Sequence, residues 1–276
     1  MKLGYINYLN SYPFYYHMME KSPIAGVDIV PGHPAELNHM IQKGMLDVSP
    51  ISAAACPAIQ GDVMLLPDFC IGSIGYVRSV ILISRIPIEE LNRKKVGLTI
   101  ASQTSVALLK ALLKKYYRIQ PIYTPKDPGP SLKNVDAALI IGNEALINSR
   151  EAIPYTYDLG DLWFRKTGFP VVFAVFTVRK SALEKYPSEI KAVIDSYHTS
   201  LKCLATEKNK LMQKAEEKYP EITHDISGYY DLLEYRFTEE LKSALNFYFS
   251  VTSELGLLQE VKSLDFMSEE IIRSNG

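Results

Sequence analysis

The sequence predicts an α/β protein built as two lobes with a cleft between them. Two observations predict this fold class. Strands rich in β-branched and aromatic residues alternate with helices over residues 2–84, and the same alternation recurs over 96–141. With 276 residues, 47% of them hydrophobic, the chain is also long enough to bury one large core or two smaller ones.

The order of these units predicts how the chain passes between the lobes. A strongly β-type run at 171–178 follows the second unit, and a mainly helical part begins at residue 188. We therefore expect lobe 2 to be an insertion in lobe 1. The predicted lobe 1 comprises residues 1–85 and 178–276, and the predicted lobe 2 comprises residues 86–177. A cleft between two lobes is a usual place for a small ligand.

The first unit begins with a strand that runs directly into a helix. Residues 2–9 have the composition of a buried strand, and Pro13 suits the first helical position because its φ is already fixed. The helix is expected to continue over 14–20. The other elements expected here are a strand at 27–31, a helix at 33–43 ended by Gly44, a strand at 46–51, short extended pieces at 64–66 and 70–71, and a strand at 76–84.

The second unit contains the clearest amphipathic helix. Apolar residues recur at three- and four-residue spacing over 106–117, directly after a strand at 96–100 and a polar turn at 101–105. Further strands are expected at 119–123 and 136–141, a proline-rich loop at 125–130, the start of a helix at 144–148, and a segment at 157–163 leading into a turn at 167–170. The third part predicts one long or two consecutive helices over 188–219, a helix from its N-cap Thr238 to about Gly256, and a last helix at 268–274.

Composition and spacing exclude several classes of function. The 30 Lys and Arg residues balance 31 Asp and Glu residues, so the basic excess that nucleic-acid binding normally requires is missing. The three cysteines and five histidines show no metal-ligand spacing, and there is no phosphate-binding loop or nucleophile elbow. No apolar run approaches the roughly 20 residues of a membrane span, and no secretory leader is seen. We expect a cytoplasmic protein without metal, nucleic-acid or membrane partners; no feature predicts its oligomeric state.

Small polar side chains follow the predicted strands of both lobes. A strand that ends in such residues and runs into a helix directs N–H and O–H donors at one point, which suits an anion such as a carboxylate. Each residue also has a plainer interpretation, as a helix cap, a half-buried strand position or a turn. Their recurrence in both lobes favours a shared ligand site. The candidates are Asn10, Ser11, Ser79, Ser102, Thr104, Ser105, Gly142 and Asn143.

Short motifs extend this interpretation. They are YLNSYP at 8–13, GSIGYVRSV at 72–80, SQTS at 102–105, ALIIG at 138–142, YDLG at 157–160 and TGFPVVFA at 167–174. In this order they resemble the chorismate dehydratase family of the futalosine route to menaquinone. The opening motif favours this family over the sister family that forms dihydroxynaphthoate later in the same pathway.

The resemblance implies a fold like that of type II periplasmic binding proteins. It also implies a hydro-lyase reaction without a cofactor, in which chorismate loses water to give 3-[(1-carboxyvinyl)oxy]benzoate. Asn10 matches the family's asparagine and would orient the substrate at the reacting carbons. Hydroxyls of Ser79, Ser102, Thr104 and Ser105 would bind carboxylates, with Ser11, Gly142 and Asn143 completing the substrate site. Since the motifs contain no histidine or paired carboxylate, the substrate's own enolpyruvyl carboxylate would take the proton.

The sequence departs from the family pattern at three places. Asn143 stands where an aspartate is expected, alanines occupy 53–55 where a more polar stretch is expected, and Glu36 falls where a basic residue is common. These departures bear on the pocket more than on the fold. Two alternatives stay open: a non-catalytic two-lobe protein that binds a small anion, and the naphthoate-forming sister enzyme.

Overall fold

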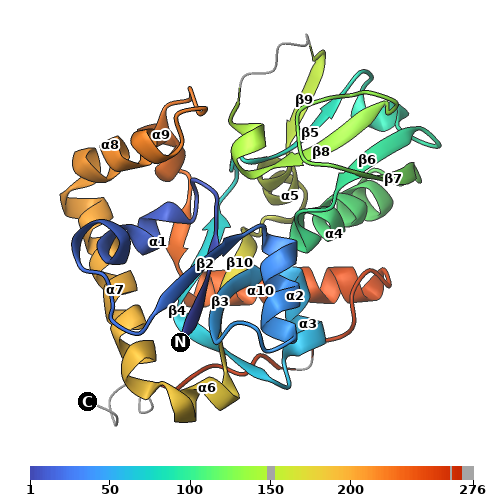
Figure 1. Cartoon of the computed structure of the whole chain (residues 1–276). Coiled ribbons are helices and arrows are strands. Elements are labelled where there is room, and N and C mark those ends of the chain that lie inside the picture. Colours follow the sequence, from blue (N-terminus) through green and yellow to red (C-terminus); the bar gives the residue numbers. More distant parts are fainter. Residues whose placement is uncertain (148–152, 262, 269–276) are drawn as a thin grey trace.

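The computed structural model describes residues 1–147, 153–261 and 263–268, which form two mixed β-sheets with helices packed against them (Figure 1). The first sheet has the strand order β11-β4-β10-β3-β1-β2. Its strands are β1 (Lys2–Ile6), β2 (Asp28–Gly32), β3 (Val48–Ser52), β4 (Val63–Ser73), β10 (Val171–Arg179) and β11 (Glu234–Arg236).

The middle of the first sheet is covered on both faces, so its strands are almost wholly apolar. Every residue of β3 is buried, and in β10 only Arg179 is partly exposed. β1 pairs in parallel with β2 and β3, whereas β10 runs antiparallel between β3 and β4. The helix α2 (Pro34–Gln42) packs on β1 and β3, and α10 (Glu239–Glu254) packs on β10.

The second sheet has the order β7-β6-β8-β5-β9 and lies at the upper right of Figure 1. β6 is parallel to β7 and β8, while β5 is antiparallel to β8 and β9. The helix α4 (Gln103–Ala111) packs on β8, and α5 (Leu159–Thr167) contacts both β5 and β10. The strands are β5 (Val80–Ser84), β6 (Lys95–Thr99), β7 (Ile122–Lys126), β8 (Ala137–Ile141) and β9 (Tyr155–Asp158).

Helices complete the side of the first sheet seen at the left of Figure 1. The helical run expected over 188–219 is two consecutive helices, and Thr238 caps α10 as predicted, its Oγ1 accepting a hydrogen bond from Leu241 N at 3.3 Å. None of the described helices is long and apolar enough to cross a membrane. The other helices are α1 (Tyr12–Tyr16), α3 (Cys56–Ile59), α6 (Lys180–Lys185), α7 (Pro187–Thr206), α8 (Lys208–Lys218) and α9 (Ile226–Tyr230). The helix expected at 268–274 lies, beyond residue 268, outside the described residues.

Two strand predictions were wrong, each for a local reason. The strand expected at 76–84 begins only at Val80, because Arg78 has a left-handed backbone (φ 60°) and residues 77–79 form a turn. The pieces at 64–66 and 70–71 belong to one strand, β4. Pro67 lies where the pairing of β4 with β10 shifts register, so a bulge accommodates the proline inside the strand.

The segment expected at 157–163 is a strand end followed by the helix α5, which the sequence did not predict and which has Gly160 in its first turn. That glycine is needed for close packing: a Cβ atom at position 160 would clash with the carbonyl oxygen of Gly75 and the hydroxyl of Ser73. The helix ends in the normal way at Gly168, whose φ is 77°.

The strands of the two sheets are grouped differently from the predicted lobes. β5, expected in lobe 1, pairs within the second sheet, and β10, expected to close lobe 2, pairs within the first. The division into 1–85 plus 178–276 and 86–177 stays a prediction. Strand pairing favours crossings between the lobes at 74–79 and 159–170 instead.

Candidate functional site

A cavity of about 40 Å³ lies where the two sheets meet. Residues at the carboxyl ends of β1, β3 and β8 reach it, together with the N-terminus of α4 and the middle of β10. It is lined by Ile6, Tyr8, Asn10, Pro34, Ser52, Ile71, Val77, Ser79, Val80, Ser102, Ser105, Ile141, Gly142, Phe173 and Ala174. The cavity therefore draws its walls from both sheets and from the start of α4.

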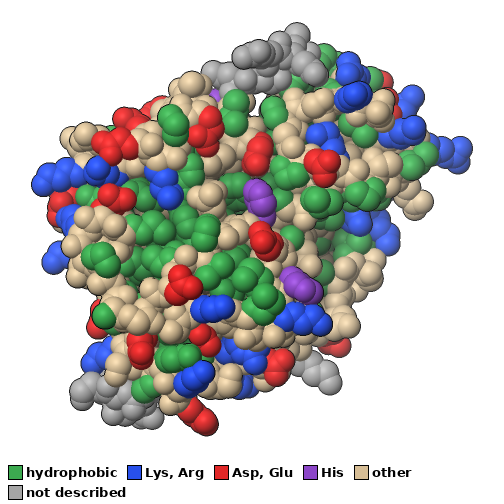
Figure 2. Space-filling model, viewed as in Figure 1, with side chains coloured by type: hydrophobic (Ala, Val, Ile, Leu, Met, Phe, Trp, Pro, Cys, Tyr) green, Lys and Arg blue, Asp and Glu red, His purple; other side chains and the backbone are tan. Residues whose placement is uncertain are grey.

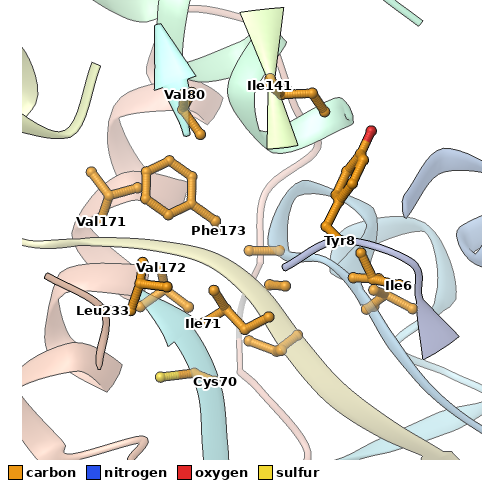
Figure 3. Close-up of a cluster of buried hydrophobic side chains, with 14 of the residues drawn as sticks. Ile6, Tyr8, Cys70, Ile71, Val80, Ile141, Val171, Val172, Phe173 and Leu233 are labelled. Carbon is orange, nitrogen blue, oxygen red and sulfur yellow. The ribbon is translucent and has the colours of Figure 1, made fainter. Parts of the chain in front are cut away.

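One wall of the cavity is apolar. Figure 3 shows Val80 and Ile141 from the second sheet facing Phe173 of β10 and Tyr8, which follows β1, with Ile71 below them. The Tyr8 hydroxyl points away from this cluster, so the cavity meets the face of its ring. Such a wall suits a flat or nearly flat carbon ring.

The polar wall carries buried atoms that have no hydrogen-bond partner among the described residues: Asn10 Oδ1, Ser52 Oγ and Ser79 Oγ. Buried polar atoms in native proteins are nearly always hydrogen-bonded, since an unpaired one costs about 1–3 kcal/mol. All three residues line the cavity, so a polar ligand there would satisfy them. Ser52 was missed in the sequence, although it follows the end of a predicted strand like the other candidates.

The turn that carries Ser79 is held by a partly buried carboxylate, that of Asp158 at the end of β9. Asp158 accepts hydrogen bonds from the backbone N–H groups of Val77 (3.1 Å) and Arg78 (2.6 Å). It also accepts from Gly160 N (2.9 Å) and Asp161 N (3.1 Å) at the start of α5. Burial raises the pKa of Asp158, and these four N–H groups act in the opposite direction by stabilising the carboxylate. The turn before β5 is thereby fixed to α5.

The N-terminus of α4 forms another part of the polar wall. Ser102 is the N-cap, since its Oγ accepts from Ser105 N at 3.4 Å, and the two hydroxyls lie 3.2 Å apart. Both residues line the cavity, so Ser102 caps the helix and faces the site at once. The positive end of the helix dipole favours an anion here by roughly 0.3–1 kcal/mol.

Thr104 has a different environment from its two serine neighbours. Its Oγ1 donates to the carbonyl of Phe173 (2.9 Å) and accepts from Ala54 N (3.1 Å). The residue is wholly buried and lies outside the cavity lining. It ties α4 to the first sheet, so the described contacts favour a structural role, and substrate binding by Thr104 stays a prediction.

The opposite rim of the cavity closes by direct contact between the lobes. Gly142 has a left-handed backbone (φ 63°) and begins a short 3₁₀ helix, Gly142–Ala145, after β8. A Cβ atom at this position would lie 2.6 Å from ring atoms of Tyr8. Only glycine allows both the backbone conformation and the approach of Tyr8.

Polar contacts reinforce this closure. Asn143 Oδ1 accepts a hydrogen bond from Leu9 N at 2.8 Å, and its Nδ2 donates to Glu221 Oε1 at 3.3 Å. The Tyr8 hydroxyl pairs with Nδ1 of His33 at 3.0 Å. Asn143 therefore joins the segment after β8 to the segment after β1, and it lies outside the cavity lining. Ser11 also lies outside the lining, and its hydroxyl is buried without a partner among the described residues.

Glu144 stands beside these contacts with an unfavourable charge. Burial raises its pKa, and the nearby Glu221 adds to this, while its own backbone N–H and His33 lower it. Because the folded pKa exceeds the unfolded one, the ionised side chain destabilises the protein, by an amount that grows as the pH rises from the unfolded pKa through the folded pKa.

We therefore expect Glu144→Gln to raise the unfolding midpoint at about pH 7, with the pH-dependent difference from the parent vanishing at about pH 3, where the side chain is protonated in both the folded and the unfolded state. Thermal unfolding of both proteins across this range measures the effect. Glu184→Gln, on an exposed residue of α6, is the control and should give no such pH-dependent difference. A constant difference at every pH would contradict the explanation.

Charge on the surface gives an anion little help. The net charge is −1, and on the face shown in Figure 2 the basic and acidic side chains are intermixed. The described residues hold no group of three or more His, Cys, Asp or Glu that could bind a metal ion. Attraction for an anion must therefore come from the local donors of the cavity.

The sequence candidates thus fall into two groups. Asn10, Ser79, Ser102, Ser105 and Gly142 meet around the cavity. Ser11, Thr104 and Asn143 lie beside it, and their roles as substrate ligands stay predictions. Besides Ser52, the sequence candidates omitted Tyr8 and Phe173, whose aromatic character alone does not distinguish a cavity wall from a core.

Comparison with known proteins gives matches over most of the chain. The model of the family described as Menaquinone biosynthesis matches residues 1–254. A chorismate dehydratase of Thermus thermophilus is 33% identical over 195 residues, which are 64% of this chain and 69% of that protein. A 1,4-dihydroxy-6-naphtoate synthase of Streptomyces coelicolor is 24% identical over 229 residues, 73% of this chain and 76% of that protein. Both relatives are named as enzymes.

A solved structure identifies the fold. The periplasmic aliphatic sulphonate binding protein of Escherichia coli superimposes with a TM-score of 0.62, covering 97% of this chain and 93% of that one at 15% identity. The periplasmic-binding-protein-like fold predicted from the motifs is therefore confirmed. At this identity the likeness concerns the fold alone.

Proposed function

We propose that this chain, which belongs to the menaquinone biosynthesis family, is a chorismate dehydratase that converts chorismate into 3-[(1-carboxyvinyl)oxy]benzoate. One observation carries the proposal. Asn10 and Ser79 belong to two of the motifs that resemble this enzyme family, and both line the cavity with buried polar atoms that have no partner among the described residues. The similarity to the chorismate dehydratase of Thermus thermophilus supports the same interpretation.

The cavity fits the chemistry of chorismate, a carbon ring with two carboxylates. Phe173, Val80 and Ile141 would contact the ring, and the N-terminus of α4 with Ser102 and Ser105 would receive a carboxylate. Ser79 and Ser52 supply further hydroxyl donors. Binding through hydroxyls and N–H groups agrees with the near-zero net charge of the chain.

The reaction breaks one C–H bond and one C–O bond. The proton leaves the ring carbon that carries the enolpyruvyl ether, the hydroxyl leaves the neighbouring carbon, and the electrons of the C–H bond complete an aromatic ring; proton and hydroxide together form water. Negative charge that builds on the ring spreads into the ring carboxylate. Donors held against that carboxylate stabilise it most when the charge is greatest.

The base in this scheme is the enolpyruvyl carboxylate of the substrate. Among the described residues that line the cavity there is no Asp, Glu, His or Lys, and the only titratable group is Tyr8. Burial raises the pKa of Tyr8, so its hydroxyl stays protonated and is a poor base. Asn10 would hold the substrate so that its carboxylate reaches the proton.

The test is to incubate the purified protein with chorismate alone and follow the enolpyruvyl benzoate. Turnover is expected, and Asn10→Ala is expected to lower kcat by about 100-fold, the effect typical of removing one positioned polar group. Asn7→Ala, on an exposed residue of the same segment, is the matched control.

Other outcomes would favour the alternatives. Tight binding of chorismate without turnover would favour a non-catalytic binding protein, and neither binding nor turnover would favour the naphthoate-forming relative. An Asn10→Ala variant as fast as the parent would remove Asn10 from the mechanism.

A further inference from the structure

Asn38 is a buried amide in the middle of α2, next to the cavity. It follows Pro34 by one helical turn, so the two share a helix face, and Pro34 lines the cavity. Asn38 is 5% exposed, and Leu37 and Ile41 beside it on the helix are wholly buried. Asparagine is a poor helix former, and a buried amide costs free energy unless it is hydrogen-bonded. Its presence at this position therefore calls for specific partners.

Both ends of the Asn38 amide have such partners, and each partner belongs to an element of the cavity wall. Oδ1 accepts a hydrogen bond from the backbone N–H of Ser52, at the end of β3, at 2.9 Å. Nδ2 donates to Oε1 of Gln103, the first residue of α4, at 3.4 Å. A backbone N–H can only donate, so the contact with Ser52 fixes which end of the amide faces β3. One side chain thus joins the end of β3 to the start of α4.

The two elements that Asn38 joins both supply serine hydroxyls to the cavity. Ser52 lines it, and the Oγ atom of Ser52 is buried without a partner among the described residues. Ser102 and Ser105 line it at the start of α4. A backbone hydrogen bond reinforces the connection, since Ala35 N in the first turn of α2 donates to the carbonyl of Ala101 at 3.0 Å. The helix α2 is therefore tied both to β3 and to the chain just before α4.

We propose that Asn38 is a positioning residue, which holds the Ser52 hydroxyl and the start of α4 in a fixed relation so that donors from both meet the carboxylates of one ligand. Asn38 is outside the cavity lining, so it acts only through these two neighbours. Donors on separate elements work together only while their relative geometry is held, because a misplacement of about 1 Å can cost about 100-fold in rate.

The kinetic test, which rests on the proposed function, is a double-mutant cycle. Asn38→Leu keeps the approximate shape and removes both hydrogen bonds, and Ser52→Ala removes the hydroxyl. Each is expected to lower kcat/KM for chorismate about 10-fold, and the double variant about 20-fold, well short of the roughly 100-fold product, because Asn38 acts largely through Ser52. A loss equal to the product, or an unchanged Ser52→Ala, would overturn the inference.

The matched control loses a buried side-chain hydrogen bond to the same strand, away from the cavity. Thr177 Oγ1 donates to the carbonyl of Ser49 in β3 at 2.8 Å, and neither residue lines the cavity. Thr177→Val should therefore keep the parent's kcat/KM. If it loses as much as Asn38→Leu, general loosening of β3 explains both results and Asn38 has no positioning role.

A second readout needs no turnover and does not depend on the folding of Asn38→Leu. Gln103 is exposed, so Gln103→Met removes one of the two Asn38 hydrogen bonds without disturbing the core. We expect hydrogen exchange at the Ser52 amide, followed by NMR, to quicken about 3–10-fold, the factor that corresponds to one ordinary hydrogen bond. Lys110→Met, near the other end of α4, is the control and should leave that rate unchanged.

The two readouts separate this inference from the proposed function. Faster exchange at Ser52 in Gln103→Met, with a parent that fails to convert chorismate, would show that the proposed function is wrong and that the positioning role stands. An exchange rate equal to that of the parent would show that Asn38 does not couple α4 to β3, and the inference would be overturned even if the parent turns over chorismate.

Discussion

Replacing Gly142 by alanine is expected to lower turnover of chorismate by about 100-fold, the size of effect that follows when reacting groups are misplaced by about 1 Å. The new Cβ atom would lie 2.6 Å from the Tyr8 ring, closer than nonbonded carbon atoms come. The backbone there also has φ 63°, which costs an L-residue other than glycine about 1 kcal/mol. Ile141 and Gly142 would be pushed away from Tyr8, and the cavity would no longer close around its ligand.

The control separates the clash from the backbone strain. Gly168 has a similar φ of 77°, and none of the described atoms beyond its chain neighbours would lie within 4 Å of a Cβ atom at that position. Gly168→Ala should therefore cost some stability at the end of α5 and leave turnover close to the parent value. Equal turnover of Gly142→Ala and Gly168→Ala, measured under saturating chorismate, would show that close approach of Tyr8 is unnecessary.

Asp158→Asn is expected to reduce the free energy of unfolding by about 1–3 kcal/mol, because backbone N–H groups that the carboxylate accepts would be left without an acceptor, and an unpaired donor costs about that much. The carboxylate accepts four backbone N–H groups, and an amide offers only one oxygen to them while directing its own N–H groups at donors. The turn at 77–79 would loosen, and Ser79 with it. Turnover should fall about 10-fold along with the stability.

Denaturant unfolding and steady-state kinetics measure the two effects together. Asp225→Asn is the matched control, because Asp225 is exposed and caps α9 with a single backbone hydrogen bond. Asparagine is about as good an N-cap as aspartate, so this change should be nearly neutral. An Asp158→Asn variant with parental stability and slower turnover would indicate a direct electrostatic role of Asp158 instead.

Local chemistry explains what the sequence predicted of the site. Asn10, Ser102 and Ser105 stand where a strand ends and a helix begins, and that junction alone directs their side chains to the cavity. Thr104 has the same local pattern, but hydrogen bonds with Phe173 of β10 and with Ala54, both distant in the sequence, decide its direction.

The same distinction holds for the fold. Strands with continuous apolar runs, such as β8 and β10, were predictable because burial on both faces determines their composition. The turn at 77–79 was not, because the residue that stabilises it, Asp158, is 80 positions away from Arg78. The role of Gly160, which lets Gly75 approach the start of α5, is likewise visible only in the folded chain.

The size of the cavity limits how tightly the chain can hold a ligand. One buried water molecule needs a cavity of roughly 10–15 Å³. A cavity of about 40 Å³ therefore has room for a few water molecules but not for a carbon ring. We therefore expect a ring-sized ligand to bind a conformation with a wider cavity, and the measured dissociation constant is the intrinsic one divided by the fraction of molecules in that conformation. Affinity is thus set jointly by contacts inside the cavity and by the free energy of widening it.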